Sequence, residues 1–155
     1  TFNLAGLQAA VIIMPDENDR KKIEDILGVL DIKRNNCFSV VATEAGYRYG
    51  EEWLEQLLKY INGNIEFVNE YCKKYIPNIK PNKAEGTYFV WLDCRELHMN
   101  KKELHDFMIN KAGIAFDDGY WFGIGGDGYM RMNAACPMSV IRKSLERLKK
   151  AVETI

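Results

Sequence analysis

Three glycines and one arginine in the segment YWFGIGGDGYMRMNAACP (residues 120–137) have types and spacing that suggest chemistry. Gly123, Gly125 and Gly128 spell G-x-G-x-x-G, which cradles a dinucleotide pyrophosphate where a strand precedes the glycines and a helix follows them. Here the residues after Gly128 read as a strand, and a helix can begin only beyond Pro137. The sequence therefore predicts a glycine-rich connection with positive φ angles rather than a nucleotide-binding turn.

Arg131 lies in that predicted strand, between two methionines. Burying an unpaired guanidinium is costly, so the side chain must meet water, an acidic group or an anion. Two readings are open. One is a structural salt bridge or an exposed strand face. The other is a bidentate clamp for a substrate carboxylate, a geometry that arginine serves better than lysine. Asn133, two residues further on, shares the face of Arg131.

The cysteines and histidines do not form a metal-binding pattern. Cys37, Cys72, Cys94 and Cys136 include no C-x-x-C pair, and His98 and His105 lack the i, i+4 spacing of a helical metal pair. We expect reduced, mostly buried thiols in a cytoplasmic protein, histidines at the surface and no metal site.

The composition is that of a soluble globular protein. The 155 residues are 47% apolar and 28% charged, enough for a core. With 21 basic and 22 acidic residues the formal net charge is −1, which argues against nucleic-acid binding. No stretch approaches the roughly 20 apolar residues of a membrane span. The start at Thr1 has no basic region, so we expect no signal peptide and read it as the interior of a longer protein.

The first part of the chain predicts one strand and three helices. The apolar run 8–14 reads as a buried strand, and Asn18 or Asp19 caps a helix that reaches about residue 30. Asn35 or Asn36 opens a second helix. After Gly50, a long amphipathic helix spans 51–75, has Gly63 as a potential bend and ends before Pro77.

The second part predicts an α+β arrangement with short, antiparallel strands. Residues 87–93 and 129–136 read as strands, and residues 114–119 as a short strand with a turn. Asn100 caps a helix that ends at Gly113, and Pro137 and Ser139 open a final amphipathic helix.

Four strings in this order carry a family resemblance: TFNLAGLQ, EGTYFVWLD, DGYWFGIGGDGYMRMNAACP and SVIRKSLERLKKAV. Together they resemble the C-terminal half of fold-type-I, pyridoxal-phosphate (PLP) enzymes of the class I/II aminotransferase superfamily. The cystathionine β-lyase type C–S lyases look like the nearest branch. The resemblance implies an α/β, PLP-dependent transferase-like fold. Residues 1–62 would end the large domain, and residues 63–155 would form a small α+β domain with a short antiparallel sheet.

The resemblance also implies positions for the site. The segment like TFNLAGLQ follows the lysine that binds PLP covalently, so no catalytic lysine is expected within this chain. Either the chain is a piece that starts after that lysine, or a cofactor-modified lysine interrupts it there; we favour the second. Arg131 matches the arginine that grips the substrate α-carboxylate. Asn133 would support this arginine, or be an ordinary polar residue of the strand face. Tyr88 would line the pocket, or pack as a core aromatic of its strand. Phe2 and Asn3 would lie near the cofactor. Trp121 and Phe122 would border the entrance, unless they simply pack.

The implied function is cleavage of sulfur-containing amino acids to thiol, pyruvate and ammonia. An aminotransferase on the same fold is the first alternative, and a fragment without catalysis is the second. The resemblance further implies a small amino-acid substrate and a homodimer. Neither nucleic acid nor a membrane is expected as a partner.

Overall fold

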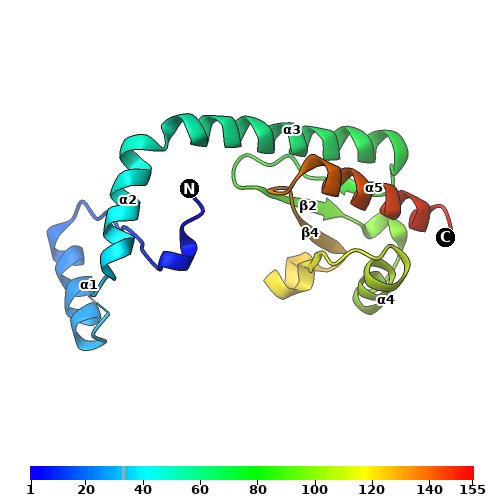
Figure 1. The fold of residues 1–155 in the computed structure, drawn as a ribbon. Helices are drawn as coiled ribbons and strands as arrows, with labels where there is room; N and C mark the ends of the chain where they lie inside the picture. The colour runs from blue at the N-terminus through cyan, green and yellow to red at the C-terminus, as the bar shows by residue number, and fades with distance from the viewer. Residues whose placement is uncertain (33) are drawn as a thin grey trace. The chain divides into compact units, whose positions relative to one another are not determined.

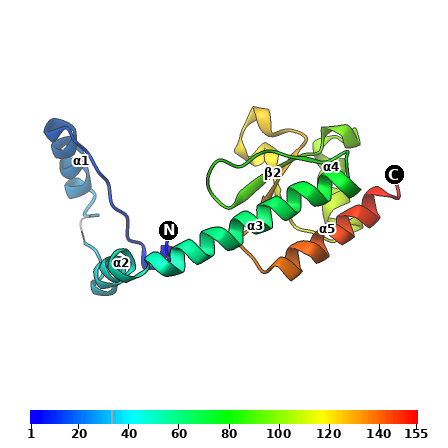
Figure 2. The same ribbon diagram turned by 90° about the horizontal axis from the view of Figure 1, so that it is seen from above.

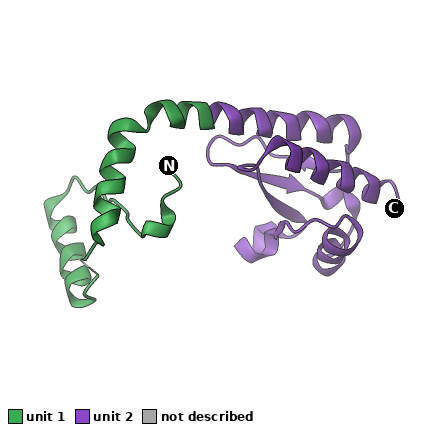
Figure 3. Ribbon diagram, in the orientation of Figure 1, with its two compact units in different colours: residues 1–57 green, residues 58–155 purple. Residues whose placement is uncertain are grey.

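The computed structural model describes residues 1–32 and 34–155 (Figure 1). The chain forms two compact units, Thr1–Leu57 and Leu58–Ile155, and the division falls within one long helix (Figure 3). The assignment of residues 1–62 and 63–155 to two domains of a whole protein stays a prediction. None of the helices in the described ranges is long and apolar enough to cross a membrane.

The first unit contains the short 3-10 turn η1 (Ala5–Leu7), the helices α1 (Glu17–Val29) and α2 (Cys37–Tyr49), and the start of α3 (Glu51–Tyr75). The caps follow local side-chain chemistry. Asp16 caps α1 by accepting from the Asp19 backbone N–H at 3.0 Å, so the predicted caps Asn18 and Asp19 are two and three residues too late. Asn36 caps α2 as predicted, and Gly50 separates α2 from α3.

Residues 8–14 do not form the predicted strand. Their backbone pairs with no strand in the described part of the chain, and Val11, Ile12 and Ile13 are exposed by 69%, 62% and 86%. A strand needs a neighbour to receive its N–H and C=O groups, and an apolar β-branched run alone supplies none. The strand prediction for residues 8–14 is therefore wrong, because β-branched composition alone does not supply a pairing partner.

The second unit contains a four-stranded antiparallel sheet of order β1-β2-β4-β3. Its strands are β1 (Lys80–Pro81), β2 (Phe89–Asp93), β3 (Asp117–Asp118) and β4 (Tyr129–Asn133). The central pair is β2 with β4, in which Trp91 lies opposite Arg131 and Phe89 opposite Asn133. The predicted small α+β domain with a short antiparallel sheet is therefore present.

Helices cover one face of this sheet (Figures 1 and 2). α5 (Met138–Val152) runs beside the second part of α3, and both contribute apolar side chains to one core. The alternate residues Val90 and Leu92 of β2, with Met130 and Met132 of β4, are buried in it. Because strand side chains alternate, the other residues of β2 and β4 face away from the core.

The helix after Asn100 has two parts. α4 (Lys101–Asp106) begins with a capping box between Asn100 and Glu103, as the cap prediction required. It continues as a π-helical turn, η3 (Phe107–Lys111), which the sequence pattern did not indicate. Gly113 follows in the left-handed region (φ 66°) and ends the element where predicted.

Asn64 ties α3 to the segment that follows β4. It is fully buried, and its Nδ2 donates to the carbonyl oxygens of Ala134 at 2.8 Å and Cys136 at 2.9 Å. α3 runs without interruption through Gly63, the predicted bend, so the helix presents Asn64 to these carbonyls in regular geometry. One amide thus fixes the exit of the strand that carries Arg131.

Candidate functional site

The sheet face opposite the helices carries a row of aromatic and charged side chains. Phe89, Trp91 and Asp93 project from β2, and Tyr129, Arg131 and Asn133 project from β4. The Trp91 ring meets the Phe122 and Tyr129 rings edge-on, with centroids 5.3 Å and 6.3 Å apart. Arg131 therefore stands in a packed aromatic setting rather than on an open polar strand face.

Arg131 is held by one carboxylate and two rings. Its Nη2 and Nε donate to Oδ2 of Asp117 at 2.6 Å and 3.0 Å. Its guanidinium carbon lies 4.0 Å from the Phe89 ring centroid and 4.3 Å from that of Phe122, so the guanidinium is stacked between both rings. The salt-bridge reading of Arg131 is confirmed, and its role as a carboxylate clamp stays a prediction.

Asn133 and Tyr88 lie close to this arginine along the strands. Asn133 is exposed on the same face of β4, and its Oδ1 accepts from the Ala135 backbone N–H at 2.8 Å. Tyr88 immediately precedes β2, its carbonyl accepts from Ala134, and its ring packs on Phe89 with centroids 4.6 Å apart. The structure thus brings Tyr88, Arg131 and Asn133 together, while their contact with substrate stays a prediction.

Phe2 and Asn3 belong to the first unit. Phe2 packs at the junction of α2 and α3, where its ring meets Tyr47 edge-on at 5.4 Å between centroids. A Cβ on Gly46 or Gly50 would approach that ring within 2.9 Å and 2.6 Å, so both glycines make room for it. Asn3 is exposed with φ 55°. Their proximity to a cofactor stays a prediction.

The glycine-rich segment leads into β4, as the sequence predicted. Gly123 (φ 122°) and Gly128 (φ 79°) adopt positive φ angles, and β4 begins at Tyr129. A strand, and not a helix, directly follows the glycines, and the next helix, α5 (Met138–Val152), begins only after β4, so the segment lacks the dinucleotide-binding geometry. Its two 3-10 turns, η4 (Gly119–Phe122) and η5 (Ile124–Gly126), instead deliver Phe122 to Arg131.

A close backbone contact that the sequence did not indicate joins these turns. A Cβ on Gly126 would lie 1.9 Å from the carbonyl oxygen of Gly119. We expect Gly126→Ala to destabilise the second unit by about 1–3 kcal/mol, because backbone cannot yield as a flexible side chain can. Thermal unfolding followed by circular dichroism measures this. Gly125→Ala is the matched control, since nothing lies within 4 Å of its Cβ position. Equal unfolding temperatures for the two variants contradict the prediction.

His105 is not merely a surface histidine. Its Nδ1 lies 2.7 Å from Oδ2 of Asp118, and the Asp118 side chain is only 1% exposed. The Tyr120 hydroxyl donates to the same oxygen at 3.4 Å. This pair ties α4 to β3, beside Asp117. The spacing rule for metal pairs could not reveal it, because the partner is a carboxylate in another element.

Removing this partner should cost stability. We expect His105→Ala to lower the free energy of unfolding by about 1–2 kcal/mol. The buried Asp118 carboxylate then loses its nearest hydrogen-bond donor, and water replaces the imidazole only in part. Urea denaturation measures the change, and Lys102→Ala on the exposed side of α4 is the control. His105→Gln, which retains a donor, should recover part of the loss; full stability of His105→Ala refutes the prediction.

The remaining ionisable groups support the packing. Arg95 forms a bidentate pair with Asp93 at 2.9 Å and 2.7 Å, and this hydrogen bonding lowers the pKa of the Asp93 carboxyl. Burial raises the pKa of the Cys72 thiol to about 12. All four cysteines are free thiols, of which Cys72 and Cys94 are buried, Cys136 is half-buried and Cys37 is exposed. Among the described residues, no cluster of potential metal ligands occurs.

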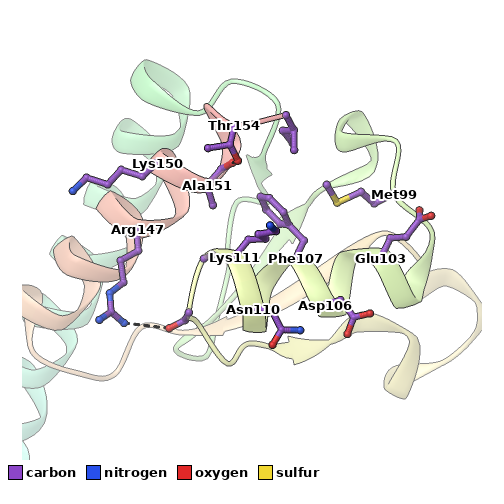
Figure 4. Close-up of a pocket in the computed structure, with 13 residues that line it drawn as sticks. Met99, Glu103, Asp106, Phe107, Asn110, Lys111, Arg147, Lys150, Ala151 and Thr154 are labelled. Atoms are coloured by element: carbon purple, nitrogen blue, oxygen red, sulfur yellow. Dashed lines mark hydrogen bonds between the residues drawn. The ribbon is translucent and has the colours of Figure 1, made fainter.

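A cavity of about 1000 Å³ lies elsewhere in the second unit, between α4, η3 and the end of α5 (Figure 4). Its walls combine Met99 and Phe107 with Lys111, Arg147 and Lys150. The Arg147 guanidinium donates to the Gly113 carbonyl at 3.2 Å. None of the candidate site residues lines this cavity, so the row around Arg131 remains the candidate site.

Comparison with protein-family models gives no match. Among curated proteins, the chain is 36% identical over 152 residues to cystathionine beta-lyase PatB of Bacillus subtilis, covering 98% of this chain and 39% of that protein. It is 27% identical over 156 residues to protein MalY of Escherichia coli, covering 100% of the chain and 40% of that protein. The chain thus spans about 40% of the length of these relatives.

Two solved structures are similar over almost the whole chain. A PLP-bound putative aminotransferase from Clostridium difficile superposes with a TM-score of 0.94 at 47% identity, covering 98% of this chain and 39% of that one. Cystalysin from Treponema denticola, which contains PLP, superposes with a TM-score of 0.91 at 38% identity, covering 99% and 39%. The expected PLP-dependent transferase fold is confirmed, as is the resemblance to a C-terminal part of the aminotransferase and C–S lyase class.

Proposed function

We propose that this chain is part of a PLP-dependent C–S β-lyase that cleaves sulfur-containing amino acids to a thiol, pyruvate and ammonia. The observation that carries the proposal is Arg131, whose guanidinium is paired on one edge and stacked between two rings beside Tyr88 and Asn133. The lyase branch is supported by the names of the curated relatives, of which PatB is a cystathionine beta-lyase.

The described residues fit the substrate side of such a site. Arg131 offers planar N–H donors, which match a carboxylate. Phe2, by contrast, packs beside Gly46, Gly50 and Tyr47 within the first unit. We propose that the lysine and the groups that hold the PLP ring and phosphate lie in the remainder of the whole protein, because this chain spans only about 40% of the length of the relatives.

PLP, when bound, supplies an electron sink for charge that develops at the substrate Cα. Arg131 binds the α-carboxylate and so fixes the direction of the Cα–H bond toward a general base. Asn133 and Tyr88 lie beside Arg131 along β4 and β2, where they would limit how the carboxylate tilts. The contribution of this chain is thus to orient the amino acid. Other residues determine which bond breaks after the Cα proton is removed.

An aminotransferase is the second candidate. It is favoured by the 47% identity to the Clostridium difficile protein, which is described as a putative aminotransferase. Both reactions begin with the same carboxylate grip and the same proton removal, so Arg131 serves either.

The test uses the full-length protein loaded with PLP. With L-cystathionine, a C–S β-lyase releases pyruvate and a free thiol in equal amounts, without a 2-oxo acid co-substrate. An aminotransferase instead releases no thiol and needs a 2-oxo acid acceptor to turn over repeatedly. Release of thiol with pyruvate supports the lyase. Amino transfer that depends on a 2-oxo acid acceptor and releases no thiol supports the second candidate. If the protein shows neither thiol release nor amino transfer, both candidate functions are refuted.

The whole protein is further proposed to be a cytoplasmic homodimer. Free thiols in all four cysteines support a reducing compartment. Exposed apolar side chains in the first unit, such as Val29, Phe38 and Val41, support burial against further protein. Sedimentation of the full-length protein tests the dimer: a monomer at micromolar concentration rejects it.

A further inference from the structure

The Arg131 guanidinium is constrained on one edge by a neighbouring strand. Asp117 of β3 is the direct cross-strand partner of Arg131, and a single oxygen, Oδ2, accepts from both Nε and Nη2. Because backbone pairing fixes the two Cα positions, the carboxylate approaches from a fixed direction. The side-on edge of the guanidinium is therefore occupied.

Its plane is constrained by two rings from different elements. Phe89 comes from β2 and Phe122 from the end of η4, with centroids 4.0 Å and 4.3 Å from the guanidinium carbon. Trp91 packs edge-on against Phe122 and thereby supports that ring from the sheet. A guanidinium stacked between two rings and held on one edge cannot turn about its Cδ–Nε bond without losing contacts.

One approach remains for a second carboxylate. The Nη1 and Nη2 atoms at the tip of the guanidinium carry N–H groups that point away from Asp117, and no described residue accepts from Nη1. The Arg131 side chain keeps 25% of its surface exposed. A carboxylate lying in the guanidinium plane can accept two parallel hydrogen bonds at this tip.

We propose that Asp117 is a positioning residue: by holding the Nε/Nη2 edge of Arg131, it presents the Nη1/Nη2 tip to the substrate α-carboxylate. This inference rests on the proposed function. The Asp117 carboxylate also makes the net charge of the site less positive, and this weakens the attraction of the site for the substrate carboxylate. The opposite role is a competitor, in which Asp117 occupies the place of the substrate carboxylate and must leave before binding. The two roles predict opposite effects of removing it.

The experiment measures binding of 2-aminoisobutyrate to the PLP-loaded full-length protein. This amino acid has a carboxylate but no Cα proton, so it binds without reacting further. We expect Asp117→Ala to raise its dissociation constant about tenfold, because the guanidinium loses its fixed direction. Asp117→Asn, which keeps a neutral acceptor, should recover most of the affinity. For substrate, KM should rise about as much while kcat changes by less than about threefold.

Two controls separate positioning from general damage. The amide of 2-aminoisobutyrate has no carboxylate, so its binding should be unaffected by Asp117→Ala. Asp127→Ala removes an exposed carboxylate from the segment between β3 and β4. It should change neither the dissociation constant of 2-aminoisobutyrate nor the KM for substrate. Tighter binding by Asp117→Ala assigns the competitor role and overturns the proposal, as does equal weakening for acid and amide. If Arg131→Ala leaves acid binding unchanged, the proposed function itself fails; if Arg131→Ala weakens it but Asp117→Ala does not, only the positioning role fails.

Discussion

Arg131→Ala in the PLP-loaded full-length protein is expected to lower kcat/KM for α-amino acids by about 10²–10³-fold, mainly through a higher KM. Loss of a partly buried, doubly hydrogen-bonded charge pair with a carboxylate costs about 3–4 kcal/mol, and each 1.4 kcal/mol is a factor of ten. Steady-state kinetics over a range of substrate concentrations measures the change. Arg131→Lys, which keeps the charge but not the planar donors, should fall between the wild type and alanine.

Arg142→Ala is the matched control for this experiment. Arg142 also stacks on an aromatic ring, with its guanidinium carbon 4.6 Å from the Phe67 centroid, but it lies on the exposed side of α5. Its removal should leave kcat/KM within about twofold. After Arg131→Ala, Asp117 loses its partner but stays 40% exposed, so water can solvate it and the fold should persist. Unchanged kinetics in a folded Arg131→Ala variant would remove this arginine from the site.

Asn64→Ala is expected to destabilise the second unit by about 2–4 kcal/mol. The substitution removes the amide that now donates to the carbonyl oxygens of Ala134 and Cys136. A buried acceptor that is left without a hydrogen-bond donor costs about 1–3 kcal/mol of stability. Asn64→Asp should be worse still, because a carboxylate would face two carbonyl oxygens in a buried place. Urea denaturation of the chain, followed by far-ultraviolet circular dichroism, measures both.

Asn62→Ala is the control, since Asn62 lies two residues away on the same helix and is exposed. It should change the free energy of unfolding by less than about 0.5 kcal/mol. A stable Asn64→Ala variant would mean that water replaces the amide at these carbonyls, and that the exit of β4 is held by packing instead.

Local signals in the sequence predicted the helices well. Asn36 and Asn100 cap helices through side-chain hydrogen bonds to N–H groups three residues away or fewer, so the required chemistry is present in the sequence itself. Gly50 and Pro77 predicted the ends of α3, Glu51 and Tyr75, and its apolar stripe predicted an amphipathic helix between them. The strand prediction for the apolar run at residues 8–14 is wrong because a strand depends on a pairing partner, which the residues of the run do not specify.

The site was predictable only in part for the same reason. Arg131 could be found because a charged residue in an apolar strand requires a partner, but nothing in the sequence identified that partner as Asp117, which is 14 residues away. Phe122 reaches Arg131 through a loop whose path depends on the contact between Gly119 and Gly126. The role of Asn64 could not be predicted from the sequence, because the carbonyl groups that accept its hydrogen bonds are 70 and 72 residues further along the chain.

The two outer strands of the sheet have a consequence for aggregation. Each is only two residues long; one consists of Lys80 and Pro81, and the other of Asp117 and Asp118. Proline has no N–H to offer a new strand, and short charged edges give a foreign chain little backbone to pair with. Both edges of the sheet therefore offer a neighbouring molecule little backbone for strand addition. The second unit thus carries, in its own edge residues, a feature that disfavours cross-β assembly through this sheet.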